Sequence, residues 1–136
     1  MSGVQVRVRV GGEQYALPVE HIHEVVDLGE LSAVPGSADS VLGLLNLGGE
    51  IVPAFDLASI LQIERDAHPR RLLIAQCEGQ RAAFAVDEVL DVGPLDGPLQ
   101  ESDSPQLLAS IVLDGAMVGM LAVDGLFASI APAVQR

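Results

Sequence analysis

The two halves of this chain repeat one pattern, and this repeat restricts the fold more than any other feature. Residues 12–25 align without gaps on residues 79–92, with an identical residue at four positions and an acidic residue in both copies at two more. Residues 47–60 align in the same way on residues 113–126. The two offsets, 67 and 66, are nearly equal in separate segments. They predict one β-rich unit of about 65 residues used twice, with chance similarity between valine-rich segments as the alternative.

Apolar runs predict short strands in both halves. Valines alternate with polar residues over Val4–Val10, which is typical of a strand buried on one face. The longest apolar stretch, Val41–Leu61, predicts two strands joined at Gly48-Gly49, after which Asp56 caps a short helix. Further elements are expected as strands over 14–17, 71–76, 80–86, 88–92, 107–113 and 117–123, a helical turn and then a strand over 19–28, a loop over 93–105, and a short helix over 125–130 that Pro132 ends.

A unit of five short strands cannot cover both of its faces alone. Closing each unit into a small barrel removes its sheet edges, and packing two barrels together supplies a shared core. We therefore predict an all-β fold, in which one domain over residues 1–136 contains two small five-stranded β-barrel subdomains with short helical turns. The subdomains are expected at about 13–70 and 71–125, with terminal strands or the last helix free to cross between them.

Composition excludes several classes of function. Seven basic residues stand against 19 acidic ones, for a net charge of −12. Phosphate-backbone binding and docking on anionic membranes both depend on Lys and Arg, so neither nucleic acid nor direct membrane insertion is expected. The one cysteine excludes an internal disulfide. Since the sequence shows neither a signal-peptide core nor a run of about 18–20 apolar residues, we expect a cytoplasmic protein.

Candidate catalytic and metal-binding residues are few. His21 and His23 would share one face of a strand, but structural zinc takes four ligands and no third ligand is near in sequence, so we favour solvent-exposed histidines. Asp56, Asp87 and Glu88 could form paired carboxylates. Asp56 is better explained as a helix cap, and Asp87 recurs as an acidic residue in the other half, which favours a structural turn. We expect no enzyme activity, no metal and no cofactor, and keep a small β-barrel enzyme or ligand-binding protein as an alternative.

The segment 41–57 resembles a known signature. The CheW-like domain of bacterial chemotaxis coupling proteins carries Gly-x-x-Asn-Leu-Arg-Gly-x-Ile-Val-Pro-x-x-Asp-Leu. The residues that match it here are Gly43, Asn46, Leu47, Gly49, Ile51, Val52, Pro53, Asp56 and Leu57. Residues 12–22, 84–87 and 113–128 resemble further parts of the family in the right order.

The resemblance implies a fold of two five-stranded barrels around a common core, and a function without catalysis. Such a domain is an adaptor between the regulatory domain of a chemotaxis-type histidine kinase and the cytoplasmic tip of chemoreceptors, which places it at receptor arrays through its partners. Carried over, the receptor-facing residues are Val25, Val26, Asn46, Leu47, Gly48, Gly49, Glu50 and Val86. The kinase-facing residues are Val34, Pro35, Val41 and Gly43.

The chain departs from the signature at one position that matters for binding. Gly48 stands where the family has Arg, and glycine cannot replace a planar guanidinium with five donors. The residues 93–107 also form a connection that is short for the family. The alternative function is therefore a divergent CheW-like module that has lost the usual receptor coupling and binds another signalling partner, or only the kinase or the array.

Overall fold

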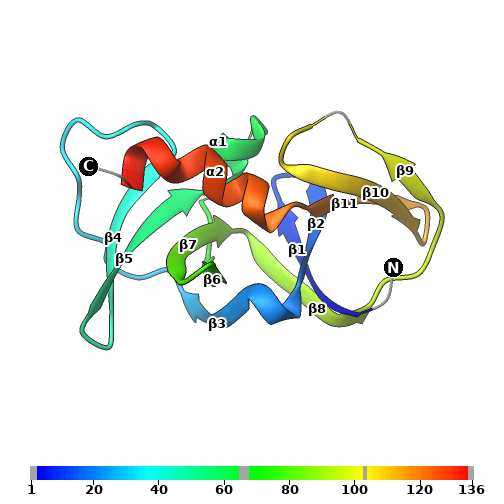
Figure 1. Cartoon of the computed structure of the whole chain (residues 1–136), viewed down its shortest axis with the longest axis horizontal. Coiled ribbons are helices and arrows are strands. Elements are labelled where there is room, and N and C mark those ends of the chain that lie inside the picture. The colour runs from blue at the N-terminus through cyan, green and yellow to red at the C-terminus, as the bar shows by residue number, and fades with distance from the viewer. Residues whose placement is uncertain (1–2, 65–67, 103, 135–136) are drawn as a thin grey trace.

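A computed structural model describes residues 3–64, 68–102 and 104–134, with side chains as far as Ile130. The first sheet has the strand order β8-β1-β2-β11-β10-β9, and the second has the order β3-β6-β7-β5-β4 (Figure 1). The strands of the first sheet are β1 (Val4–Val10), β2 (Glu13–Pro18), β8 (Glu88–Pro94), β9 (Leu99–Glu101), β10 (Leu107–Leu113) and β11 (Ala116–Leu121). Those of the second are β3 (Ile22–Asp27), β4 (Val41–Leu47), β5 (Glu50–Asp56), β6 (Arg71–Cys77) and β7 (Gln80–Val86). The helical elements are a 3₁₀ turn (Val19–His21), α1 (Leu57–Leu61) and α2 (Val123–Val134).

The two sheets repeat the same strand order. The offsets carry β3, β6, β7, β5 and β4 onto β8, β1, β2, β11 and β10. They also carry one parallel register onto the other, since Ala54 lies opposite Ala83 in one sheet and Met120 lies opposite Ala16 in the other. Each sheet takes strands from both halves of the chain. The boundary near residue 70 therefore separates the two sequence repeats and not the two sheets, and the subdomain limits stay a proposal.

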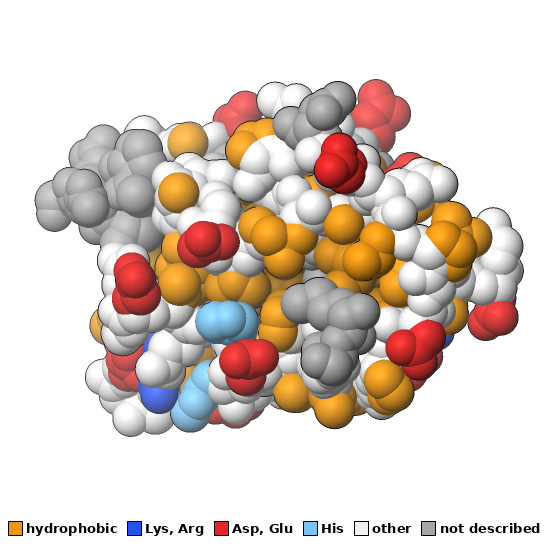
Figure 2. All heavy atoms as spheres, turned by 45° about the vertical axis from the view of Figure 1, so that its right-hand side comes forward, with side chains coloured by type: hydrophobic (Ala, Val, Ile, Leu, Met, Phe, Trp, Pro, Cys, Tyr) orange, Lys and Arg blue, Asp and Glu red, His pale blue; other side chains and the backbone are white. Residues whose placement is uncertain are grey.

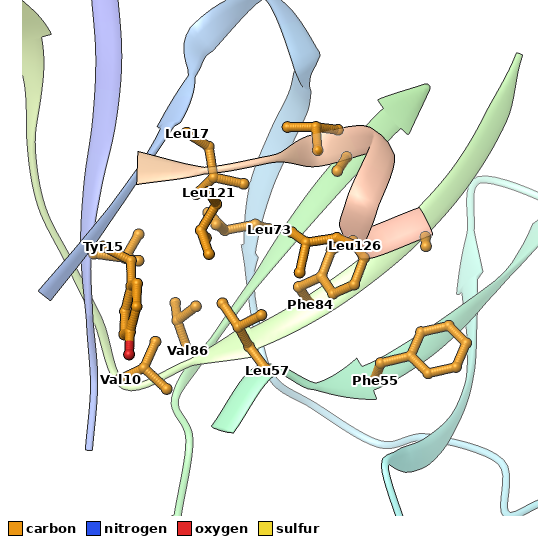
Figure 3. Close-up of a cluster of buried hydrophobic side chains, with 14 of the residues drawn as sticks. Val10, Tyr15, Leu17, Phe55, Leu57, Leu73, Phe84, Val86, Leu121 and Leu126 are labelled. Atoms are coloured by element: carbon orange, nitrogen blue, oxygen red, sulfur yellow. The ribbon is translucent and has the colours of Figure 1, made fainter. Parts of the chain in front are cut away.

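Three apolar clusters hold this arrangement together, because successive residues of a strand face opposite sides. The shared core lies between the two sheets and includes Leu17, Leu73, Phe84 and Leu126 (Figure 3). A second cluster around Val52 fills the other face of the second sheet, and a third around Ile111 fills the other face of the first. The prediction of an all-β fold with two small β units around a common core is confirmed.

Most predicted elements are confirmed, including the hairpin at Gly48-Gly49 and the helical turn before β3. The Asp56 side chain accepts a hydrogen bond from the Ala58 N–H at 3.2 Å, as expected for a helix cap.

Two predictions in the C-terminal part are wrong. The loop expected over 93–105 contains the strand β9, which pairs with β10 and makes the first sheet six-stranded. Helix α2 begins at Val123, which was expected in the last strand, and continues past Pro132 to Val134. Pro132 removes one backbone donor from the helix. The helix forms in spite of this loss because Leu126 and Phe127 are buried in the shared core.

Candidate docking surface

The shared core is closed on one side and bordered by edge strands on the other. Helices α1 and α2 lie along one side of the molecule, and β3 and β8 lie along the opposite side (Figure 1). Val25 on β3 is paired with Leu73, and Val92 on β8 is paired with Val6. Leu73 and Val6 belong to the shared core, and paired residues share a face of the sheet.

Val25 and Val92 therefore point to the inner side of their sheets and are nevertheless 41% and 58% exposed. The reason is that β3 and β8 are the outermost strands of the two sheets. The half-buried Ile22 and Val89 pack against the shared core on the same two strands. We call these four residues the β3/β8 surface.

Carboxylates on the same two strands face the opposite side of each sheet, because their strand partners Arg7, Arg9 and Ile74 lie outside the shared core. On β8, Asp91 accepts a hydrogen bond from the Nε of Arg7 at 3.0 Å, and Glu88 accepts one from the Nη1 of Arg9 at 2.9 Å. The bond from Arg7 lowers the pKa of the Asp91 carboxyl below its usual value. On β3, Glu24 is exposed. Figure 2 shows one face of the molecule on which hydrophobic side chains gather beside histidines, with acidic side chains around them.

The predicted receptor-facing residues do not come together. Val25 is exposed, whereas Val26 is half-buried and packs on the cluster around Val52. Val86 is fully buried in the shared core, so its side chain serves folding and is not available to a partner. The segment 46–50 forms the tip of the β4–β5 hairpin, and β4 and β3 are opposite edges of the second sheet. The residues on β3 and those of the hairpin tip are therefore far apart because of the strand order, which the local sequence does not encode.

The hairpin tip is exposed and is held by two side-chain hydrogen bonds. The Asn46 Oδ1 accepts a hydrogen bond from the Gly49 N–H at 2.9 Å. Gly48 and Gly49 have φ values of +59° and +95°, the left-handed region that a two-residue hairpin turn requires. The Glu50 Oε1 accepts a hydrogen bond from the Nη1 of Arg81 at 2.7 Å. Leu47 is half-buried and packs on the cluster around Val52, so only its neighbours present surface.

Two of the predicted kinase-facing residues are exposed, and the other two are packed inside the protein. Val34 and Pro35 are exposed in the connection between β3 and β4. Val41 packs against the shared core. Gly43 is buried, and a Cβ at this position would lie 2.6 Å from the carbonyl oxygen of Ser32. Gly43 therefore lets the chain approach closely between 32 and 44, and it offers no side chain to a partner.

Val92 and Ile51 are among the exposed apolar residues that were not predicted as site residues. The offset of 67 places Val92 in the position of Val25, so the repeat could have identified it. Ile51 is 59% exposed beside the hairpin tip. It lies within the family signature. Because the residues after it in the signature are also apolar, the sequence does not show that the Ile51 side chain is exposed.

The three carboxylates considered for acid–base chemistry have structural contacts. Asp56 caps α1, Asp87 accepts a hydrogen bond from the Gly11 N–H at 2.9 Å, and Glu88 accepts one from the Nη1 of Arg9 at 2.9 Å. Within residues 3–64, 68–102 and 104–134, no cluster of three or more His, Cys, Asp or Glu side chains could hold a metal ion. None of the helices in these ranges is long and apolar enough to cross a membrane.

The family assignment follows from comparison with known proteins. The profile of the CheW-like domain matches residues 5–131. The chain belongs to the CheW-like domain family. The crystal structure of the scaffolding protein TtCheW from Thermoanaerobacter tengcongensis superposes on this CheW-like domain with a TM-score of 0.82 and 25% identity, over 90% of this chain and 86% of that one. Domains of this family are non-enzymatic, and so is this one.

Relatives in other bacteria are similar to parts of this CheW-like domain. Chemotaxis protein CheW of Thermotoga maritima is 35% identical over 78 residues, 57% of this chain and 52% of that protein. Chemotaxis protein CheW of Helicobacter pylori is 31% identical over 84 residues, 60% of this chain and 51% of that protein. The aligned part therefore spans about half the length of these two relatives. A probable chemotaxis protein CheW of Rhizobium etli is 26% identical over 121 residues, 88% of this chain and 77% of that protein.

Proposed function

We propose that this CheW-like domain is an adaptor that couples chemoreceptors to a chemotaxis-type histidine kinase, in the cytoplasm at receptor arrays. Its relatives are named chemotaxis proteins, and the similar solved protein is titled a scaffolding protein. The observation that carries the proposal is the β3/β8 surface, where Val25 and Val92 occupy equivalent positions of the two repeats and remain exposed beside the shared core.

The chemistry of this surface suits the side of an amphipathic helix. Such a helix places apolar side chains at intervals of three and four residues on one face, which an apolar strip can bury. The net charge of −12 favours a helix with basic residues beside that face, because complementary charge raises the association rate. A receptor's cytoplasmic tip, which is a helical coiled coil, has this form. The exposed residues Val34 and Pro35 lie on the separate β3–β4 connection, which we assign to the kinase.

The test is a titration of the purified chain with the receptor tip and, separately, with the regulatory domain of the kinase. Val25→Glu and Val92→Glu should each weaken receptor binding by about tenfold or more, because a buried charge replaces an apolar contact. Val112→Glu is the matched control, since Val112 is 36% exposed on β10. Affinity for the kinase domain should stay unchanged in all three. Full receptor affinity in the β3 and β8 variants would refute this surface, and no kinase binding at tens of micromolar would refute the coupling role.

The alternative is a divergent module without the usual receptor coupling, and Gly48 favours it. No described atom lies within 4 Å of a Cβ placed at Gly48, so a long side chain fits there. Gly48→Arg should raise receptor affinity if the adaptor role holds in detail, whereas Gly48→Lys controls for charge and for the positive φ but lacks the planar fork. An unchanged affinity in the Arg variant would favour the divergent module.

A further inference from the structure

A pair of histidines at the start of β3 lies next to the β3/β8 surface. His21 ends the 3₁₀ turn and is half-buried, and His23 lies on β3 and is exposed. Ile22, which belongs to the β3/β8 surface, stands between them in the chain. Both histidines line a cavity of about 350 Å³ between the start of β3 and the end of β6. Figure 2 shows histidine side chains beside the gathered hydrophobic ones, so a charge on the imidazoles would act on this surface.

The His21 ring is oriented by a hydrogen bond to the main chain. Its Nδ1 lies 3.2 Å from the carbonyl oxygen of Gln76. A carbonyl oxygen only accepts hydrogen bonds, so Nδ1 carries the hydrogen and Nε2 of the neutral ring is unprotonated. An added proton binds Nε2 and leaves the bond to Gln76 in place. Protonation of His21 therefore adds a charge without requiring the chain to rearrange.

The charged groups that face the two histidines are acidic. Glu20 on the 3₁₀ turn and Glu78 on the β6–β7 turn line the same cavity. The Oε1 of Glu24 on β3 lies 3.6 Å from the Nε2 of His23. Carboxylates of this kind stay ionised above about pH 5. Near neutral pH, uncharged imidazoles therefore stand beside three negative charges.

The cations on the neighbouring strands have partners of their own. Strand β1, which packs against the 3₁₀ turn, carries Arg7 and Arg9, and both donate hydrogen bonds to carboxylates of β8. On β6 and β7, Arg71 and Arg81 are ion-paired with carboxylates of β3 and β5. These arginines therefore do not neutralise the carboxylates beside the histidines.

The remaining titratable group in the cavity is the thiol of Cys77 on β6. Burial raises its pKa, and the charges of Glu78 and, on α2, Asp124 raise it further. The thiol is therefore uncharged at and below about pH 8. Among the described groups that line the cavity, only the histidines change their charge between about pH 8 and about pH 6.

We propose that His21 and His23 make receptor binding at the β3/β8 surface dependent on pH, with a lower affinity at acidic than at basic pH. This inference rests on the adaptor role proposed above, in which the acidic chain attracts a helix with basic residues beside its apolar face. Two positive charges gained beside Ile22 reduce that attraction, and a basic partner in turn disfavours the protonated rings. At low salt, where screening is weak, we expect about a threefold loss of affinity between about pH 8 and about pH 6.

The test is a titration of the chain with the receptor tip at about pH 8 and about pH 6, at one low salt concentration. The double variant His21→Gln with His23→Gln cannot gain the charges, and a glutamine amide can still donate to the carbonyl oxygen of Gln76. Its affinity should match that of the parent chain at the higher pH and should be nearly the same at the lower pH. His68→Gln is the matched control, because His68 is exposed in the connection before β6, and it should keep the pH dependence of the parent. Titration of groups on the receptor affects all three chains alike.

The histidine ring signals in NMR spectra of the free chain show directly whether each ring gains a proton, and the same spectra report that the variants are folded. Rings that stay neutral down to about pH 6, or an equal pH dependence in the parent and the double variant, would overturn the proposal. So would a pH dependence that does not shrink at about 0.5 M salt, since salt screens a charge effect. No receptor binding at the higher pH would refute the adaptor role itself, whereas binding that does not respond to pH would refute only the pH switch.

Discussion

Replacing Val52 and Ile51 separately by Asp tests which face of β5 is buried in the second sheet. These residues are neighbours on one strand, yet Val52 is 1% exposed in the cluster of the second sheet and Ile51 is 59% exposed. Adjacent strand residues face opposite sides. The same chemical change should therefore have opposite consequences at the two positions.

The magnitudes follow from burial. Removing a buried valine side chain loses about 1.5–3 kcal/mol of the free energy of unfolding. A carboxylate in an apolar cluster adds several kcal/mol, whether it is buried as a charge or must first take up a proton. For Val52→Asp the sum is about 4 kcal/mol or more, a large part of the roughly 5–15 kcal/mol that stabilises a typical domain. Ile51→Asp should cost less than about 1 kcal/mol, because the side chain stays in water.

Urea unfolding followed by circular dichroism measures both variants. Val52→Ala, which should lose about 2–3 kcal/mol, gives a value even if Val52→Asp does not fold. Ile51→Asp should keep a midpoint close to that of the parent chain. A full cooperative transition in Val52→Asp would show that Val52 is not in the core, and the assigned faces of β5 would be wrong.

Two further predictions concern the first sheet. Gly119→Ala should lose about 1–3 kcal/mol of the free energy of unfolding, because its Cβ would overlap the ring of Tyr15. In the double variant, Tyr15→Leu should recover part of this loss. If urea unfolding shows that the losses of the two single variants simply add, the contact is contradicted. Asp91 has a lowered pKa through Arg7, so its contribution to stability is present above about pH 4 and is lost as the pH falls through the lowered pKa. Asp91→Asn should therefore cost less than about 1 kcal/mol at pH 7 and less still at pH 2, in urea unfolding at the two pH values. An equal cost at both would exclude an ionic origin.

Much of the local structure could be predicted because it depends on near neighbours in sequence. Alternating valines identified β1, and the glycine pair at 48 and 49 identified a hairpin turn that needs positive φ values. The spacing of Asp56 and the following apolar residues identified α1 and its cap. Strand β9 was missed because its three residues, Leu99–Glu101, carry no alternating pattern and lie among prolines and glycines. It is a strand only because β10 offers backbone partners.

The candidate site could be predicted only in part. Val25 was predicted as a site residue, but Val92 was not, although the repeat places the two residues in equivalent positions. Val86 and Gly43 looked like surface residues in the family pattern and are buried. Exposure depends on which strands become sheet edges, and the order of strands is set by pairing between residues far apart in sequence.

The sequence by itself determined that the chain is a duplicated all-β domain with an acidic surface and a CheW-like signature, because periodicity, turn residues and repeats are local properties. Only the tertiary structure decided which side of the shared core the helices close and which side β3 and β8 leave exposed. It also decided that the ring of Tyr15 packs on Gly119 in the first sheet. These outcomes depend on packing between distant segments, where the volume and orientation of each side chain act together.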